Sequence, residues 1–256
     1  MTQYVAARFT LMLPVIFGIT LLTFALMRII PGDVLDVMYA DSPMNAQEIA
    51  DLRHKLGMDK PFHVQYADWM GGLLRLDAGN SLWTRRPVLQ EISDRLPVTL
   101  QLAAMAFIVQ LLIAIPVGVL SATHQDKPAD SIARFFTILG TAVPDFWLAT
   151  IVIVFIASSF GWIPPLGGVA SIKDDPFTNL QQFMLPALVL GVSGASSLAR
   201  LTRNTLLEVI REDYVRTAFS KGLADRSVWY GHAIKNALIP VITNAGSHLG
   251  FLLGGT

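Results

Sequence analysis

The chain has 256 residues and a formal net charge of zero; 53% of its residues are hydrophobic and only 15% are charged. A soluble domain carries about a quarter charged residues, so the composition argues against an ordinary soluble fold. Zero net charge provides no general attraction to nucleic acid, and we expect no nucleic-acid partner. Cysteine is absent, which excludes disulfides and thiolate metal sites.

Charged residues are missing from long stretches of the chain. A bilayer core of ~30 Å requires ~20 apolar helical residues, and five stretches meet or approach that length. We therefore predict an all-α fold, a polytopic transmembrane helix bundle in contact with membrane lipid. The stretches are Thr10–Met27, Leu96–Gln125, Pro176–Ala199, Asn236–Thr256 and Phe135–Ile172, the last containing only Asp145 as a charged residue.

The first stretch predicts a transmembrane helix at about Phe9–Ile30, in a first domain of residues 1–30. No small-residue cleavage site follows it, so we interpret it as a retained helix and not as a signal peptide. Pro14 and Gly18 lie inside it, as membrane helices tolerate.

Residues 31–96 are polar and predict a second domain, a helical cap outside the membrane. Asn45 with Glu48 forms a capping box, and Gly57 is placed to end that helix. Pro61 opens a second, amphipathic helix. We expect the apolar face of that helix to lie on the membrane surface or on a partner protein. That face comprises Tyr66, Trp69, Met70, Leu73 and Leu74.

Residues 97–256 predict a third domain, a transmembrane domain that includes a polar loop at residues 200–240. Its last helix covers only ~25 Å from Pro240 to Thr256, so we expect that helix to be incomplete and a C-terminal helix to be missing. In chain order the expected elements are a helix at 97–122, a loop at 124–134, a helix at 135–160 broken at Pro144, a turn at 161–182, a helix at 183–199, a polar segment at 200–235 and a final helix from Asn236.

Basic residues in short loops mark the cytoplasmic side of a membrane. Basic residues outnumber acidic ones in Arg200–Lys235, whereas Gly161–Gln182 has the opposite balance. The first segment is therefore expected inside and the second outside. Alternation of the spans then predicts a cytoplasmic N-terminus and a periplasmic cap.

The basic segment itself predicts a compact knob between two spans. Arg211–Phe219 can form a short helix, Gly222 can break it, and Ser227–Asn236 can form a second helix. A small residue at Ala218 would let another protein approach closely. A rigid short helix across the membrane plane could be pushed as a lever.

Tyr214–Leu223 reads Tyr-Val-Arg-Thr-Ala-Phe-Ser-Lys-Gly-Leu. This segment resembles the docking loop of membrane subunits of binding-protein-dependent ABC importers, in the dipeptide, oligopeptide, glutathione and nickel branch. The chain departs from the general class signature in two ways. Arg216 replaces a glutamate, and the spacing from Gly222 to the Ala237–Pro240 motif is longer. Both departures fit the peptide branch.

The resemblance extends to Arg28–Asp33 and Arg95–Leu100. It implies the type I ABC importer permease fold in a bacterial inner membrane, where two permease subunits form one pathway for peptides or a related small solute. The implied partners are a second permease subunit, two ATP-binding ATPase subunits, and a periplasmic or lipid-anchored solute-binding protein. The implied ATPase-docking residues are Tyr214, Val215, Arg216, Thr217, Ala218, Lys221, Gly222, Leu223 and Pro240.

Three polar residues in apolar segments are candidates for lining a pathway. Asp145 follows Pro144, so it either caps a restarted helix or faces a pathway, and the capping interpretation is favoured. Asn244 and His248 share one helix face, and either pathway lining or interhelical hydrogen bonding explains them equally well.

Catalysis by this chain is not expected. The sequence contains no Gly-x-x-x-x-Gly-Lys-Ser/Thr segment and no His-Glu-x-x-His segment, and nothing resembles a nucleophile with its base. We expect no catalytic residue, no metal ligand and no cofactor. The alternatives are a self-sufficient channel or ion-coupled carrier, which needs intramembrane charges of which only Asp145 qualifies, and a membrane-embedded enzyme, which lacks a catalytic cluster.

Overall fold

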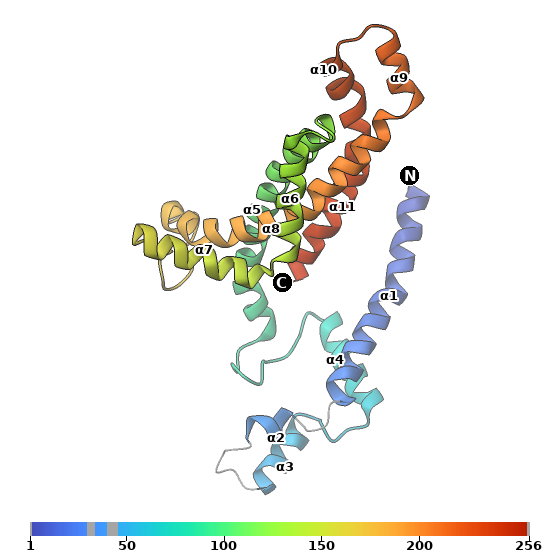
Figure 1. Ribbon diagram of the computed structural model, residues 1–256. Coiled ribbons are helices and arrows are strands. Elements are labelled where there is room, and N and C mark those ends of the chain that lie inside the picture. Colours follow the sequence, from blue (N-terminus) through green and yellow to red (C-terminus); the bar gives the residue numbers. More distant parts are fainter. Residues whose placement is uncertain (1, 30–33, 40–45, 255–256) are drawn as a thin grey trace. The chain divides into compact units, whose positions relative to one another are not determined.

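The computed structural model describes residues 2–29, 34–39 and 46–254 (Figure 1). Within these ranges the regular elements are all helical, and the one β-type contact is an isolated bridge between Asn80 and Pro87. The chain forms two compact units, Met1–Ser93 and Asp94–Thr256. The predicted all-α polytopic fold is confirmed.

In the part that the structure describes, the first unit holds four complete helices, which follow one another in the sequence, and the start of α5 (Val88–Thr123). The four complete helices are α1 (Thr2–Ile29), α2 (Val34–Met38), α3 (Ala46–Lys55) and α4 (Phe62–Leu74).

Helix α4 packs against α1 through aromatic side chains. The ring of Phe24 lies edge-on to Tyr66, with centroids 5.4 Å apart, and stacks on Trp69 at 6.0 Å. The hydroxyl groups of Thr20 and Tyr66 are 3.0 Å apart and share a hydrogen bond. Part of the apolar face predicted for the membrane surface or a partner therefore contacts the first transmembrane helix of the same chain.

The sequence signals for the ends of α3 and α4 are confirmed where they can be compared. Gly57 follows α3 with φ of +65°, a left-handed conformation that suits glycine. Pro61 is the residue that precedes the first turn of α4. The predicted capping residue Asn45 lies outside the described residues.

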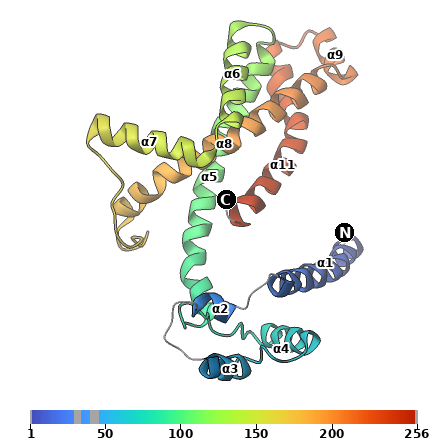
Figure 2. The same cartoon turned by 60° about the horizontal axis from the view of Figure 1, so that its bottom comes forward.

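The second unit contains the rest of α5 and the helices that follow it, and Figure 2 shows the chain from another direction. Helix α8 packs against α6, α7 and α11. The helices are α5 (Val88–Thr123), α6 (Pro128–Ala142), α7 (Asp145–Phe160), α8 (Pro176–Ile210), α9 (Asp213–Ser220), α10 (Asp225–Val228), a π-helical turn (Trp229–Ala233) and α11 (Ile234–Gly254).

Several helices are longer than the apolar stretches that predicted them. Helix α5 begins at Val88 instead of 97, α6 begins at Pro128 inside the expected loop, and α8 continues to Ile210. The length of an apolar stretch reflects the thickness of the bilayer that the helix crosses, whereas the helix itself can continue beyond the bilayer into water.

The start of α8 also has a local cause. The backbone N–H of Thr178 donates to the Asp175 carboxylate over 3.0 Å, and Pro176 occupies the first turn. The hydrogen bonds from Thr178 lower the pKa of the Asp175 carboxyl below its ordinary value.

Four helical segments of the described chain are long and apolar enough to cross a membrane, namely Val5–Ile29, Val88–Thr123, Pro176–Ile210 and Asp225–Gly254. Helices α6 and α7 add a fifth if the pair counts as one span, although they bend by 105° between them. The bend lies at the predicted break, since α6 ends at Ala142 and Pro144 precedes α7.

Small side chains allow α5, α8 and α11 to approach closely. The core cluster between them contains Ala114, Ala195, Ala199 and Ala245, all almost fully buried. A Cβ atom at Gly118 would lie only 2.7 Å from the carbonyl oxygen of Ala199. Helix association in a membrane depends on such close packing, because lipid offers no hydrophobic drive between helices.

We predict that replacing Gly118 with valine destabilises the second unit. Its added carbons would overlap the backbone of α8, and overpacking of this kind costs about 1–3 kcal/mol. The thermal unfolding midpoint of the purified subunit measures the effect. Gly246→Ala is the control, because a Cβ at Gly246 meets nothing within 4 Å. Equal midpoints for the two variants would contradict the packing argument.

Candidate coupling site and polar cavity

Helices α9 and α10 form a protruding hairpin between α8 and α11, at one end of the second unit (Figure 1). Helix α9 contacts both α8 and α10. The predicted short helix at Arg211–Phe219 is thus observed with slightly later bounds, Asp213–Ser220.

The inner face of α9 is held by a small apolar cluster. Val215 is fully buried and Ala218 is 7% exposed, and both pack with Val228 and with Val209 of α8. The small residue at position 218 therefore packs inside the chain, and the close approach of another protein at this position stays a prediction. Among the predicted docking residues, Val215 and Ala218 support α9 from within.

The outer face of α9 and the following turn is exposed and mixes apolar with basic side chains. Tyr214, Phe219 and Leu223 are each about two-fifths exposed. A short amphipathic helix with exposed apolar side chains suits insertion into a groove of another protein. The predicted docking residues on this exposed surface are Tyr214, Arg216, Thr217, Lys221, Gly222 and Leu223.

The turn after α9 depends on Gly222, whose φ is +78°. Only glycine adopts this conformation without steric cost, so the predicted break is confirmed. The base of the hairpin is tied back to α11 by Asn236, whose Nδ2 donates to the hydroxyl of Tyr214 over 2.7 Å. Pro240 lies exposed inside α11 and not in the hairpin.

The second helix predicted at Ser227–Asn236 is not a separate element. Helix α10 ends at Val228, a π-helical turn follows, and α11 begins at Ile234. The final span therefore starts within the region that was expected to be polar loop. The reason is burial, since Val228, Ala233 and Ala237 pack into the apolar clusters of the unit.

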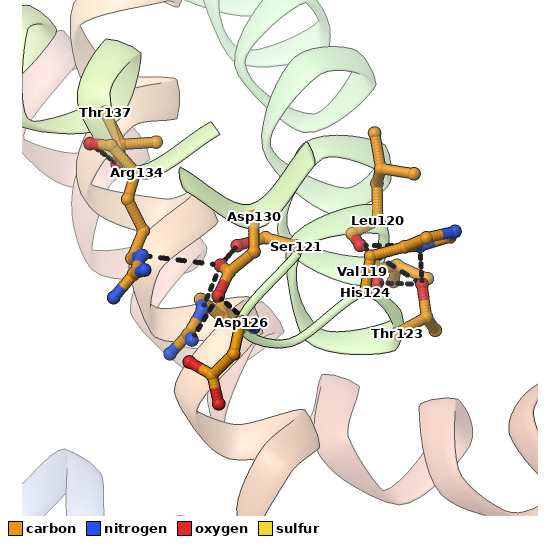
Figure 3. A network of polar contacts seen from close by, with 10 residues as sticks. Val119, Leu120, Ser121, Thr123, His124, Asp126, Asp130, Arg134 and Thr137 are labelled. Carbon is orange, nitrogen blue, oxygen red and sulfur yellow. Dashed lines mark hydrogen bonds and ion pairs between the residues drawn. The ribbon is translucent and has the colours of Figure 1, made fainter. Parts of the chain in front are cut away.

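A buried ion pair that the sequence analysis did not identify lies where α5, α6 and α8 meet (Figure 3). The side chain of Asp130 is fully buried. Arg203 donates to both of its carboxylate oxygens. Nε of Arg203 lies 2.8 Å from Oδ1, and Nη2 lies 2.9 Å from Oδ2. The Ser121 hydroxyl and the Asp126 backbone N–H also donate to this carboxylate.

Arg134 adds a weaker ion pair, with its Nε 3.6 Å from an Asp130 oxygen. The carboxylate is thus fully surrounded by donors, the arrangement that a buried charge requires. Arg203 precedes the end of α8 by seven residues, about 10 Å of helix. We call the Asp130–Arg203 pair the clamp, and it holds the section of α8 from which the hairpin emerges.

A cavity of about 240 Å³ lies between five helices of the second unit. Its polar lining residues are Gln110 of α5, Thr141 of α6, Asp145 of α7, Ser193 and Ser197 of α8 and His248 of α11. Gln110 is buried, and its Nε2 lies 3.3 Å from Nδ1 of His248. The two predicted pathway candidates Asp145 and His248 therefore share one cavity.

The structure shows what surrounds each of the three intramembrane candidates, and their role in a pathway stays a prediction. Asp145 begins α7, but Pro144 occupies the capping position and makes no side-chain cap hydrogen bond. Asp145 therefore contributes to the start of α7 only through its negative charge in the first turn, which the helix dipole favours. His248 makes an interhelical contact and also lines the cavity, whereas Asn244 is exposed and does not line it.

Within the described ranges, no group of three or more His, Cys, Asp or Glu side chains could hold a metal ion.

Comparison with curated proteins gives relatives along the whole chain. A di/tripeptide transport system permease protein of Pseudomonas aeruginosa is 38% identical over 274 aligned residues, which cover all of this chain and 82% of the relative. An oligopeptide transport system permease protein of Bacillus subtilis is 35% identical and 81% covered. A dipeptide transport system permease protein of Escherichia coli is 34% identical and 82% covered.

Two family models also match. The model of the N-terminal part of binding-protein-dependent transport system membrane components matches residues 1–103. The model of the binding-protein-dependent transport system inner membrane component matches residues 114–256, more than half of the chain. With its apolar helices, the chain is a multi-pass membrane protein, and it belongs to the family of binding-protein-dependent transport system inner membrane components.

Proposed function

We propose that this chain is a permease subunit of an ABC importer for peptides, and that it couples a transport pathway to ATP hydrolysis by partner subunits. The observation that carries the coupling role is the hairpin. Helix α9 is fixed to α8 and α10 by buried Val215 and Ala218, while its other face is exposed. A helix fixed on one side and open on the other can transmit the push of a bound partner.

The clamp extends this argument to the membrane helices. Movement of α9 reaches α8 directly, and Arg203 links α8 to α6 through Asp130. Helix α6 leads to the bend at Pro144 and to the cavity. A rigid connection of this kind lets two discrete arrangements of the helices follow two states of the ATPase.

The partners follow from the same proposal. Two ATPase subunits would each grip one hairpin such as this one, a second permease subunit would complete the pathway, and a solute-binding protein would deliver the cargo outside. The basic residues of the 200–235 segment favour a cytoplasmic hairpin and, by alternation, a cytoplasmic N-terminus. Peptide as the cargo rests on the names of the relatives.

The experiment is uptake into proteoliposomes that contain the complete importer. We expect labelled dipeptide to accumulate only when ATP is present on the hairpin side and the binding protein on the opposite side. Liposomes that hold this subunit alone should take up none. Uptake by the subunit alone would favour a self-sufficient channel or carrier and would refute the proposal.

A further inference from the structure

The carboxylate of Asp145 has no partner in the part of the chain that the structure describes. No hydrogen bond or ion pair to its side chain is found there, although the residue is half-buried and lines the cavity. An ionisable group inside a membrane domain is costly and is normally paired or functional. Asp145 also directly follows the 105° break between α6 and α7, and discontinuous membrane helices frequently form substrate sites.

The rest of the cavity offers acceptors and no competing cation. Ser193 and Ser197 lie one helical turn apart on α8, so both hydroxyls belong to the same face. Neither hydroxyl makes a hydrogen bond within the described chain. The described lining contains no lysine or arginine, and the one basic side chain, His248, already contacts Gln110.

We propose that this cavity binds a primary ammonium group of the transported solute, with Asp145 as the counter-ion and the α8 hydroxyls as further acceptors. An ammonium group carries three donors and no acceptor, which matches a carboxylate beside hydroxyl oxygens. About 240 Å³ is enough for the first residue or two of a peptide but not for a long chain. The inference rests on the proposed transport function and names the end of the peptide that this site recognises.

The absence of cysteine from the chain provides a clean test. We introduce Ser193→Cys in the assembled importer and compare its modification by a cationic and an anionic methanethiosulfonate. The cationic reagent should react faster by about tenfold or more, since charged clefts concentrate counter-ions by at least that factor. Asp145→Asn should abolish the preference and Asp145→Glu should keep it.

The control is Ser158→Cys, which lies about 20 Å further along α7 and is exposed. Asp145→Asn should leave its reagent preference unchanged. If Ser193→Cys shows no cationic preference, or if the preference survives Asp145→Asn, the proposed site is refuted. Neither measurement requires ATP-driven uptake. A negative result would therefore refute the proposed site without refuting the proposed transport function.

Protection by ligands identifies the recognised group. Alanyl-alanine should slow modification of Ser193→Cys by the cationic reagent, and N-acetyl-alanyl-alanine should not. Ethylamine tests whether the ammonium group alone is sufficient for protection. If ethylamine also protects, the site is supported and accepts other primary amines besides peptides. Equal protection by the free and acetylated dipeptides, or none by either, would overturn the assignment.

Discussion

Replacing Arg203 with methionine should severely destabilise the second unit, by about 3–5 kcal/mol. The variant keeps an unbranched apolar stem but removes the guanidinium group, which leaves the fully buried Asp130 carboxylate without its bidentate partner. The Ser121 and Asp126 donors remain but supply no compensating charge, and the remaining cation, Arg134, lies 3.6 Å away in a weaker ion pair. We expect a large fall in the amount of folded subunit recovered from membranes and a lower thermal unfolding midpoint.

Two further variants distinguish the loss of the ion pair from the loss of a positive charge on α8. Arg200→Met removes an exposed arginine from the same helix and should behave like the unmodified protein. The double variant Asp130→Asn with Arg203→Met removes both charges, and it should recover part of the stability lost in Arg203→Met. If Arg203→Met is no worse than Arg200→Met, the clamp contributes nothing to the fold.

The clamp also shows where sequence reasoning reaches its limit. Asp130 and Arg203 are 73 residues apart, and each looked like an ordinary charge in a polar segment. Local spacing predicts which side chains share a helix face, but it does not predict which helices meet. Glycine and proline signals act locally, and for that reason Gly57, Gly222 and the break at Pro144 were all predictable.

The cavity was predictable in part. Asp145 and His248 were recognised as polar residues in apolar segments, and the same signal was available for Gln110, a buried amide within the uncharged Leu96–Gln125 stretch. That the three belong to one site is a property of the tertiary packing. Asn244 carried the same signal as His248 yet does not line the cavity.

Replacing Gly222 with valine should uncouple transport from ATP hydrolysis without preventing membrane insertion. At φ of +78° a side chain costs about 1–2 kcal/mol of backbone strain, so α9 should shift relative to α10. A Cβ at Gly222 meets nothing within 4 Å, so the fold itself has room for it. A bias of that size changes the balance between two states by roughly 5–30-fold.

The measurement compares peptide uptake and ATPase activity in the reconstituted importer. We expect uptake to fall by roughly that factor, while ATP hydrolysis continues but no longer responds to loaded binding protein. Gly231→Val is the matched control, because Gly231 lies in the π-helical turn, has an ordinary φ and is equally open. The two variants add the same atoms near the same end of the unit. A loss of uptake in Gly222→Val alone would therefore show that coupling depends on the orientation of α9 in the hairpin. Unchanged uptake in Gly222→Val would remove the hairpin from the coupling route.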